Sequence, residues 1–255
     1  MIHDTLIFSR LKDRDLSKEG LIIGEGRFLA ERVAASCPLV AAAAVPEARE
    51  KMEGIIQGRC PLYELSRGEI SRIAGYDFHR GMLIAAERPG KVLFRGNPLV
   101  QNGTRILICA GIGDPENLGT IIRTALAMGW EGVALDAAST DPFSRKALRC
   151  SMGASLSMPL MYFDSPGDIA SIKEQGWKLA GALLEDNAPA PSELKRITKL
   201  ALMLGNEGFG LPEKYSCICD IAVCIPQLQN DFVDSLNVSA AAAILLWEGR
   251  RNGNA

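Results

Sequence analysis

Short apolar segments alternate with segments of helical pattern from residue 104 onward, and this alternation restricts the chain to a small group of folds. Five segments have the length and composition of buried strands, at residues 105–110, 132–135, 179–184, 200–204 and 221–225. Helices are expected to begin at Leu118, Ser144, Gly167 and Ser235. Apolar strands separated by helices are typical of a parallel sheet covered on both faces. The sequence therefore predicts an α/β domain over residues 104–255.

The first 90 residues also alternate between strand and helix patterns. The expected elements are a turn leading into a helix, a strand, a second helix and a second strand, over residues 21–36, 39–45, 46–56 and 81–87 respectively. Five glycines and prolines within residues 88–103 are typical of a linker, in which residues 92–94 could form a short strand. We therefore predict a small α/β domain over residues 1–90, a linker over 91–103 and the larger domain over 104–255.

Composition excludes disordered and membrane-spanning proteins. Of the 255 residues 47% are hydrophobic, which is enough for a globular core. The longest apolar runs, such as residues 240–247, are much shorter than the roughly 20 residues that span a bilayer. Residues 1–15 lack the apolar region of a signal peptide. We expect a cytoplasmic protein with no membrane segment.

The seven cysteines are an odd number without the spacing of a disulfide framework, which favours free thiols in a reducing compartment. Cys217 and Cys219 would share a face if they lay on a strand, and could then ligate one metal ion. No C-x-x-C pair or nearby histidine completes a zinc site. Packing as small apolar residues is the favoured interpretation, and we expect no metal.

The formal net charge of −2 does not by itself indicate a nucleic-acid partner. Proteins that bind phosphates usually carry an excess of lysine and arginine. Here residues 1–90 contain 13 basic and 13 acidic residues, which leaves 15 and 17 for the remainder of the 28 and 30 in the chain. Any RNA binding must therefore come from local basic patches, or from dimerisation that brings two patches together.

Three motifs in the second part of the chain place polar residues beside glycines or at the start of an apolar helix. They are NLGTIIRTA from Asn117, LMLGNEGFGLP from Leu202 and SLNVSAAAAILLWE from Ser235. Taken alone, each has a structural interpretation, because Asn and Ser cap helices and glycines allow sharp turns close to a ligand. A dinucleotide-binding loop is a competing interpretation, but GIGDPE from Gly111 lacks the third glycine of that motif.

In this order and at these separations, the three motifs resemble the signature of the SpoU (TrmH-type) branch of the SPOUT methyltransferases. Members of this family transfer a methyl group from S-adenosylmethionine to ribose 2′-hydroxyl groups of RNA. The resemblance therefore implies an RNA 2′-O-methyltransferase acting on structured rRNA or tRNA. It also implies a SPOUT-type catalytic domain in which the C-terminal part of the chain forms a deep trefoil knot.

The resemblance assigns roles to eight residues. The catalytic residues are Asn117, Arg123, Ser235 and Asn237. The donor-binding residues are Gly205, Glu207, Ile225 and Leu236. In the first set, the two residues of the third motif face the reacting ribose. In the second set, the glycine and the two apolar residues contact the donor through their backbone, and the glutamate orders the cleft or the donor-binding loop.

Arg123 has two possible roles, since the only histidines, His3 and His79, lie outside the motifs. Methyl transfer requires removal or neutralisation of the proton on the 2′-hydroxyl group. The family precedent gives this task to the arginine, as a base assisted by an RNA phosphate. Because a guanidinium group holds its proton at neutral pH, Arg123 could instead stabilise the developing alkoxide and hold a phosphate.

The third motif departs from the family pattern after Ile225 and Pro226. The usual Met and Gly are absent, Gln227 stands in the Met position, and the loop to Ser235 is about two residues longer than in the family. This departure leaves an alternative open, a non-catalytic or weakened RNA-binding relative of the same family. Retention of five family residues favours the enzyme: Asn117, Arg123, Glu207, Ser235 and Asn237.

The remaining resemblances concern RNA and oligomeric state. Residues 25–33 and 78–85 are similar to the small RNA substrate-binding domain of many members, which resembles a ribosomal protein; a structural α/β domain with another partner is the alternative. A basic cluster could contact RNA phosphates or be only a solvated face, and it consists of Arg145, Lys146 and Arg149. Members usually dimerise through the C-terminal domain, so the apolar face of residues 240–247 is the expected homodimer interface, with packing inside the monomer as the alternative.

Overall fold

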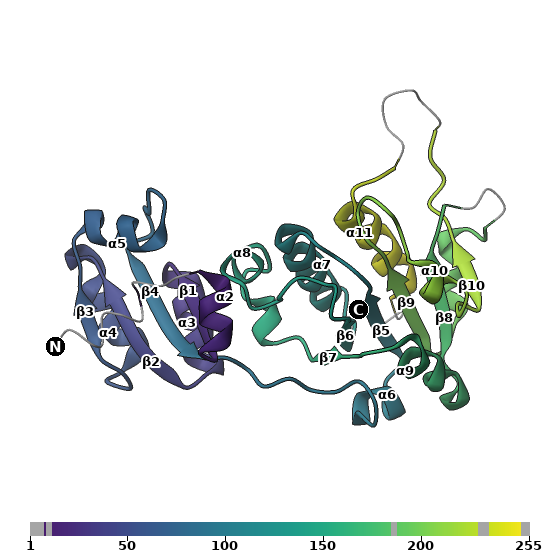
Figure 1. Ribbon diagram of the computed structural model, residues 1–255, viewed down its shortest axis with the longest axis horizontal. Coiled ribbons are helices and arrows are strands. Elements are labelled where there is room, and N and C mark those ends of the chain that lie inside the picture. Colours follow the sequence, from purple (N-terminus) through teal and green to yellow (C-terminus); the bar gives the residue numbers. More distant parts are fainter. Residues whose placement is uncertain (1–7, 9–11, 185–187, 229–234, 251–255) are drawn as a thin grey trace. The chain divides into compact units, whose positions relative to one another are not determined.

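The computed structural model describes all residues except 1–7, 9–11, 185–187, 229–234 and 251–255, and the chain forms two compact units (Figure 1). The first unit comprises Met1–Gly90 and Pro142–Ser157. The second comprises Lys91–Asp141 and Met158–Ala255. Residues 142–157 thus fold with the first unit, although the chain on either side of them belongs to the second. No helix among the described residues is long and apolar enough to cross a membrane.

A four-stranded sheet in the order β1-β4-β2-β3 forms the centre of the first unit. Its strands are β1 (Leu21–Glu25), β2 (Leu39–Ala44), β3 (Leu62–Glu64) and β4 (Met82–Glu87). β4 is antiparallel to β1 and β2, whereas β2 and β3 are parallel. The predicted strands over 39–45 and 81–87 are confirmed. The turn predicted from residue 21 is wrong, because the apolar residues of β1 pair along their whole length with the buried strand β4.

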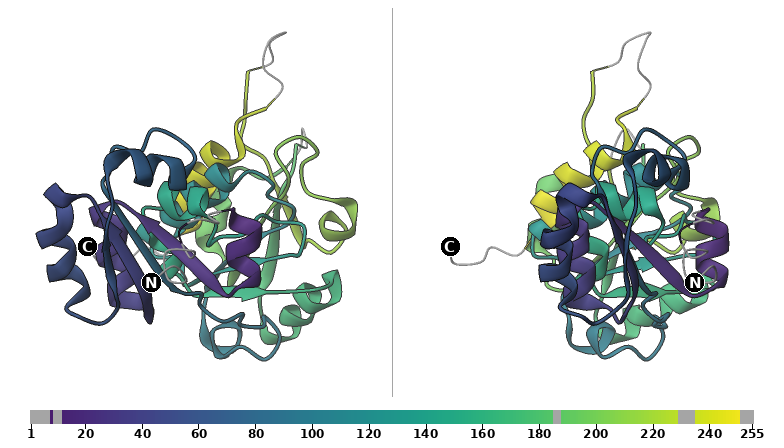
Figure 2. Two further views of the ribbon diagram at one scale, coloured as in Figure 1. Left: turned by 60° about the vertical axis from the view of Figure 1, so that its left-hand side comes forward. Right: turned by 90° about the vertical axis from the view of Figure 1, so that its left-hand side faces the viewer.

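Helices cover both faces of this sheet (Figure 2). α3 (Arg27–Ser36) and α4 (Arg49–Ile56) lie on one face, and α2 (Asp13–Lys18) and α5 (Arg67–Ala74) lie on the other. A short 3-10 turn, η1 (Pro46–Ala48), leads into α4 and completes the predicted second helix. β3 and α5 have no counterpart among the predicted elements, although Ser66 and Glu69 form a capping box that marks the start of α5.

The later segment of the first unit contains α8 (Arg145–Cys150) and η2 (Ala154–Leu156). α8 contacts β1, and η2 contacts α3. The hydroxyl group of Ser144 accepts a hydrogen bond from the backbone N–H of Ala147, so Ser144 caps α8 where the sequence predicts a helix to begin.

A six-stranded parallel sheet in the order β10-β8-β9-β5-β6-β7 forms the centre of the second unit, as predicted. Its strands are β5 (Arg105–Cys109), β6 (Gly132–Leu135), β7 (Leu160–Tyr162), β8 (Lys178–Ala182), β9 (Leu200–Leu204) and β10 (Ile221–Val223). Five of these correspond to predicted strands. The sixth, β7, is one of two three-residue edge strands, and the sequence pattern did not mark it.

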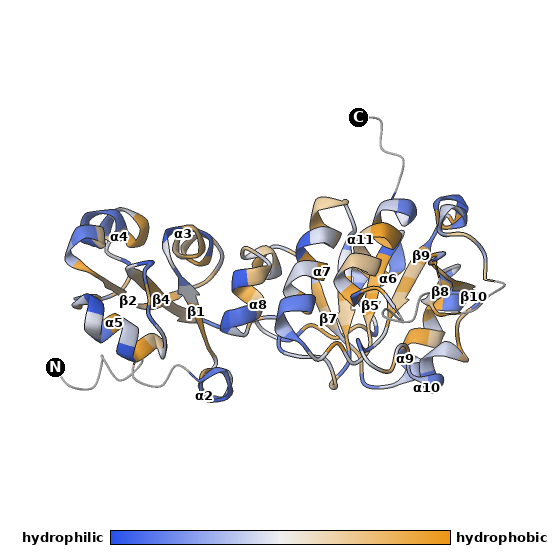
Figure 3. Cartoon of the chain, turned by 90° about the horizontal axis from the view of Figure 1, so that it is seen from above, coloured by the Kyte–Doolittle hydropathy of each residue, from blue (hydrophilic) through white to orange (hydrophobic). Residues whose placement is uncertain are grey.

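Helices α7 (Pro115–Ala127) and α11 (Val238–Gly249) pack against each other, and α11 also contacts β9 and η4 (Pro191–Arg196). Figure 3 shows that α11 is apolar along most of its length. A separate buried cluster joins the sheet to the elements α6 (Pro98–Asn102), α9 (Pro166–Ala170), η3 (Ser171–Gln175) and α10 (Glu213–Ser216). The helices therefore enclose a sheet in which the strands β5, β6 and β9 are buried along their whole length.

Two helices begin three residues from their predicted positions. α7 begins at Pro115 rather than Leu118, because the Asp114 side chain accepts a hydrogen bond from the N–H of Glu116 and proline occupies the first helical position. α11 begins at Val238 rather than Ser235, because Asn237 is its N-cap. Asn117 therefore lies inside the first turn of α7 instead of the preceding loop, and Ser235 precedes α11.

Residues 91–103, predicted as a linker, pack into the second unit. They contain α6, and Phe94 and Val100 are buried in the cluster described above. The short strand considered for residues 92–94 is reduced to a single bridge between Leu93 and Tyr162.

Candidate functional site

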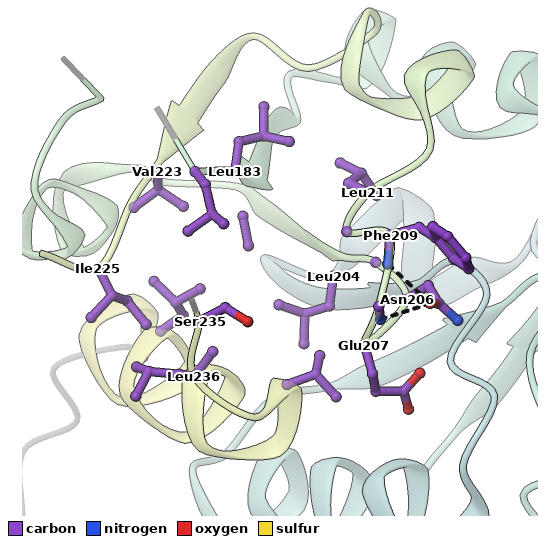
Figure 4. A pocket seen from close by; sticks show the side chains of 18 of the residues that line it. Leu183, Leu204, Asn206, Glu207, Phe209, Leu211, Val223, Ile225, Ser235 and Leu236 are labelled. Atoms are coloured by element: carbon purple, nitrogen blue, oxygen red, sulfur yellow. Dashed lines mark hydrogen bonds between the residues drawn. The ribbon is translucent and has the colours of Figure 1, made fainter. Parts of the chain in front are cut away.

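A cavity of about 370 Å³ lies at the carboxyl ends of three neighbouring strands of the second unit (Figure 4). The last residues of these strands, Ala182, Leu204 and Val223, line it. Open α/β sheets bind ligands at this edge, and the volume is typical of small-molecule sites. Five of the predicted site residues also line the cavity: Gly205, Glu207, Ile225, Ser235 and Leu236.

The second motif forms a tight turn after β9 at one wall of the cavity. The backbone groups of Asn206 and Gly210 exchange two hydrogen bonds of 2.8 and 2.9 Å. A Cβ atom at Gly205 would lie 2.2 Å from the carbonyl oxygen of Gly210 and from the nitrogen of Leu211, so only glycine fits there. The turn is held to the loop after β5, since the Asn206 side chain donates a hydrogen bond of 2.9 Å to the carbonyl oxygen of Gly111. Its backbone is thereby presented to the cavity at close range.

A chain of side-chain hydrogen bonds joins the three motifs. The Nδ2 atom of Asn237 donates to Oδ1 of Asn117 at 3.1 Å. The Nδ2 atom of Asn117 donates in turn to Oε1 of Glu207 at 3.0 Å. The capping role of Asn237 is compatible with this bond, because its Oδ1 atom accepts from the N–H of Ser239 at 2.8 Å. The structure therefore brings together three residues that are 30 to 120 positions apart in the chain.

Glu207 is held as a carboxylate. Burial alone would raise the pKa of this carboxyl group, but the hydrogen bonds that it accepts outweigh burial and lower the pKa below its usual value. These bonds come from the Asn117 side chain and from backbone N–H groups, among them those of Gly113 and Asp114 at 3.4 and 3.3 Å. A single charged acceptor thus fixes both the start of α7 and the orientation of the Asn117 amide group.

Arg123 takes no part in this series of hydrogen bonds. It is exposed on α7 and is not among the residues that line the cavity. No described group forms a hydrogen bond or an ion pair with its guanidinium group. Asn117 and Arg123 are six positions apart on α7, so their side chains leave the helix in different directions. The catalytic role of Arg123 stays a prediction.

The third motif reaches the cavity through residues on both sides of a segment outside the described residues. Ile225 and Gln227 line the cavity before that segment, and Ser235 and Leu236 line it after. The loop from Gln227 to Asp234, which departs from the family pattern, falls mostly within residues 229–234 and so lies outside the described residues. Gln227, which stands at the family's Met position, is nevertheless a cavity residue.

A second polar network, which the sequence pattern did not mark, supports the loop before α7. The Asp136 carboxylate, buried at the end of β6, accepts from the N–H groups of Gly111 and Ser139 at 2.9 Å each. Ser139 Oγ donates to the same carboxylate at 2.8 Å and accepts from the N–H of Ile112 at 3.1 Å. Burial, together with the charge of Asp136 and a hydrogen bond to it, raises the pKa of Tyr215 to about 12. Asp136 therefore anchors the loop that leads into α7, the helix that carries Asn117.

Replacement of Asp136 by alanine is expected to lower the free energy of unfolding of the second unit by about 2 kcal/mol, since the partly buried N–H groups of Gly111 and Ser139 lose their acceptor. The same change should weaken ligand binding in the cavity, because Gly111 holds Asn206. Denaturant unfolding and calorimetry would measure the two effects. Asp136→Asn, which keeps an acceptor oxygen, is the matched control and should lose clearly less stability and ligand affinity than Asp136→Ala. Equal losses of stability in both variants would contradict the anchoring role of the hydrogen bonds.

The predicted basic cluster lies in the first unit, where two of its members have an acidic partner. Nε of Arg145 is 2.6 Å from Oε1 of Glu25, and Nη1 of Arg149 is 2.8 Å from Oε2. The Glu25 side chain is fully buried and also accepts a hydrogen bond of 2.6 Å from the Tyr76 hydroxyl group. These arginines therefore hold α8 to β1, a role that the sequence did not reveal. RNA contact by Arg145, Lys146 and Arg149 stays a prediction.

Helix α11 is divided between a buried and an exposed face. Ala242, Leu245 and Leu246 are buried inside the second unit, so part of the run over residues 240–247 packs within the monomer. Ile244 and Trp247 are 41% and 50% exposed. An apolar strip thus remains on the outer face of this helix.

The cysteine cluster has no metal-site geometry among the described residues. Cys217 ends α10 instead of lying on a strand, and Cys219 packs near Met203, with 3.7 Å between the two sulfur atoms. No group of three or more His, Cys, Asp or Glu side chains is placed to hold a metal ion in the described part of the chain.

The chain is similar to known RNA methyltransferases in sequence and to one solved structure in fold. An uncharacterized tRNA/rRNA methyltransferase of Mycobacterium tuberculosis is 32% identical over 243 residues, covering 92% of this chain and 83% of its own. A 23S rRNA (guanosine-2′-O-)-methyltransferase, RlmB, of Acinetobacter baylyi is 34% identical over 194 residues, or 73% of this chain and 76% of its own. The crystal structure of an AdoMet-bound rRNA methyltransferase from Sinorhizobium meliloti has the same fold, with a TM-score of 0.82 at 24% identity over 96% of this chain and 93% of that one.

The family comparison covers most of the second unit and all three motifs. The profile of the SpoU rRNA methylase family matches residues 104–247, more than half of the 255 residues. This match begins one residue before β5 and ends within α11, so it includes every strand of the parallel sheet, helix α7 with Asn117, and Asn237 with most of α11. The chain therefore belongs to the SpoU rRNA methylase family.

Proposed function

We propose that this protein transfers the methyl group of S-adenosylmethionine to a ribose 2′-hydroxyl group of structured rRNA or tRNA. The observation that carries the proposal is the hydrogen-bonded chain from Glu207 through Asn117 to Asn237, which joins three motifs beside one cavity. Family membership supports it, and so does the name of the Acinetobacter relative, which is a 2′-O-methyltransferase of 23S rRNA.

The cavity suits the methyl donor. Leu204, Val223, Ile225 and Leu236 form an apolar lining that can enclose an adenine ring. The turn at Gly205 leaves backbone groups, rather than a side chain, at the wall. When bound, S-adenosylmethionine supplies a methyl group on a positively charged sulfur. The Sinorhizobium protein, which has the same fold, holds this donor in its crystal structure.

The residues around the cavity would position the ribose and assist the loss of the proton from its 2′-hydroxyl group. Ser235 and Asn237 are suited to hold ribose hydroxyl groups, since both carry groups that donate and accept hydrogen bonds. Glu207 keeps the Asn117 amide group in one orientation, with its oxygen toward Asn237. Arg123, which is exposed, is available to an RNA phosphate and to the developing alkoxide. Holding the 2′-oxygen in line with the donor's methyl group would complete the arrangement.

Several finer features belong to the same proposal. The family resemblance supports a deep trefoil knot in the second unit, and a cytoplasmic enzyme. It supports a homodimer, for which the exposed strip with Ile244 and Trp247 on α11 is the candidate interface. For the first unit it supports an RNA substrate-binding domain that resembles a ribosomal protein, over residues 1–90, ahead of a methyltransferase domain over 104–255.

Incubation of the protein with isotopically labelled S-adenosylmethionine and total unmodified RNA tests the proposal. After digestion to nucleosides, mass spectrometry is expected to find the label in a 2′-O-methylated ribose. Reactions without RNA and with pre-methylated RNA are the controls. Label on a base would refute the assigned chemistry, and neither label nor donor binding would favour the non-catalytic RNA-binding relative.

A further inference from the structure

Phe209 stands out among the large apolar side chains at the cavity. It is 93% exposed, whereas the next most exposed large apolar residue of the lining, Leu184, is 71% exposed. Figure 4 shows its ring directed away from the interior of the cavity, beside Asn206. A single exposed apolar side chain needs no explanation on a mobile surface loop. Phe209 requires one because its backbone is fixed.

The turn holds Phe209 in place and leaves its ring uncovered. The N–H groups of Gly208 and Phe209 both donate to Oδ1 of Asn206, at 2.9 and 3.2 Å. The bonded pair of Asn206 and Gly210 closes the turn on either side. The two residues that flank Phe209 are glycines, so no neighbouring side chain shields either face of the ring. An aromatic ring is thus presented to solvent at a defined position.

We propose that Phe209 is a stacking platform for an unpaired nucleobase of the RNA, at the methylated nucleotide or its neighbour. The inference rests on the proposed function, which requires a ribose 2′-oxygen at the cavity mouth. The base is bonded to C1′ of that ribose, the carbon next to C2′, so it must lie close to the same mouth. Unpaired RNA bases are recognised by stacking on aromatic side chains. Phe209 lines the cavity and is largely exposed, so its ring lies at the mouth, where such a base can stack on it.

The charge of the protein favours a contact of this kind. With a net charge of −2, the chain has little general attraction for phosphates. Stacking does not depend on charge, and every base offers a π-face, so the contact adds affinity without fixing the base. Two other groups could cover the Phe209 ring. If the adenine of the donor stacked on it, loss of the ring would weaken donor binding. If a second copy of the chain packed on it, loss of the ring would change the oligomeric state.

Three substitutions at Phe209 separate these occupants. Phe209→Ala removes the ring, Phe209→Leu keeps an apolar side chain without a π-face, and Phe209→Trp keeps the stacking surface. The binding probe is a single-stranded oligouridylate of about 12 nucleotides, within the range that such sites cover. We expect Ala and Leu to weaken binding of this RNA about tenfold and to lower kcat/KM for RNA methylation by a similar factor. Phe209→Trp should retain both, and its indole fluorescence should be quenched by the RNA.

The donor affinity and the molecular mass of each variant are measured in the same experiment. Calorimetric titration with S-adenosylmethionine and light scattering should give the wild-type values for all three variants. A Leu variant equal to wild type, a loss of donor affinity in the Ala variant, or a change in mass would each overturn the stacking proposal. The proposed function can fail separately: if the wild type transfers no methyl group but the oligouridylate still binds tenfold more weakly to Phe209→Ala, stacking stands and the assigned reaction does not.

Discussion

Arg123→Ala is expected to reduce methyl transfer to RNA by at least about a hundredfold, the cost of removing one group that stabilises charge in a transition state. The same change should leave the protein folded, because the Arg123 side chain is exposed and its guanidinium group bonds to no described residue. Exposed substitutions of this kind usually change stability by less than about 0.5 kcal/mol. Single-turnover methylation and thermal unfolding, measured on the same preparation, would show lost activity with an unchanged transition.

Two further variants identify what the guanidinium group does. Arg123→Lys keeps a positive charge but loses the planar pair of donors, so it should retain measurable activity if charge alone is needed. It should be as inactive as alanine if the group must hold a phosphate through two hydrogen bonds or act as the base. Arg196→Ala is the matched control, since Arg196 is exposed in the second unit and pairs only with Glu193 among the described residues. Full activity of Arg123→Ala would remove Arg123 from the mechanism.

The central sheet was readable from the sequence because its strands are apolar on both faces. β6 and β9 have the predicted bounds, since Gly132–Leu135 and Leu200–Leu204 are each fully buried between helices. β7 was not predicted, whereas β10, the three-residue strand at the other edge of the sheet, was; strand length and edge position therefore do not by themselves explain the difference. The starts of α7 and α11 were displaced because side-chain capping by Asp114 and Asn237 decides where a helix begins, and the apolar pattern does not record it.

The residues of the site could be predicted from the sequence, but the hydrogen bonds between them could not. The motifs named Asn117, Glu207 and Asn237, and the structure joins these three. Asp136 could not be found in the same way, because a lone acidic residue after a strand has no pattern until the loop at Gly111 folds against it. For the basic cluster, the sequence pattern was visible but its structural role was not. Charge on a short helix looks solvated or RNA-facing, and only the fold reveals that Glu25, 120 positions away from Arg145, is its partner.

Glu25→Ala is expected to destabilise the first unit by about 3 kcal/mol, because loss of one partner from a buried ion pair leaves the other charges without compensation. Glu25 is fully buried between Arg145, Arg149 and Tyr76, and these contacts fasten residues 142–157 to β1. Amide hydrogen exchange in α8 should accelerate in the variant. Glu64→Gln is the matched control, since Glu64 pairs with Arg49 at an exposed site and the loss should stay below about 0.5 kcal/mol.

The pH dependence of this effect has a definite sign. Burial raises the pKa of Glu25, but hydrogen bonds from Tyr76 and both arginines, with the charge of Arg145, lower it below the ordinary value of 4.5. A carboxyl group with a lowered pKa in the folded state stabilises the protein fully above its unfolded pKa, and this contribution is lost as pH falls through the folded pKa. The difference in unfolding free energy between wild type and Glu25→Gln should therefore be constant above about pH 5 and shrink below about pH 4.5. A difference independent of pH down to pH 3 would mean that the charge of Glu25 is not what holds α8, and that the loss in Glu25→Ala comes from packing alone.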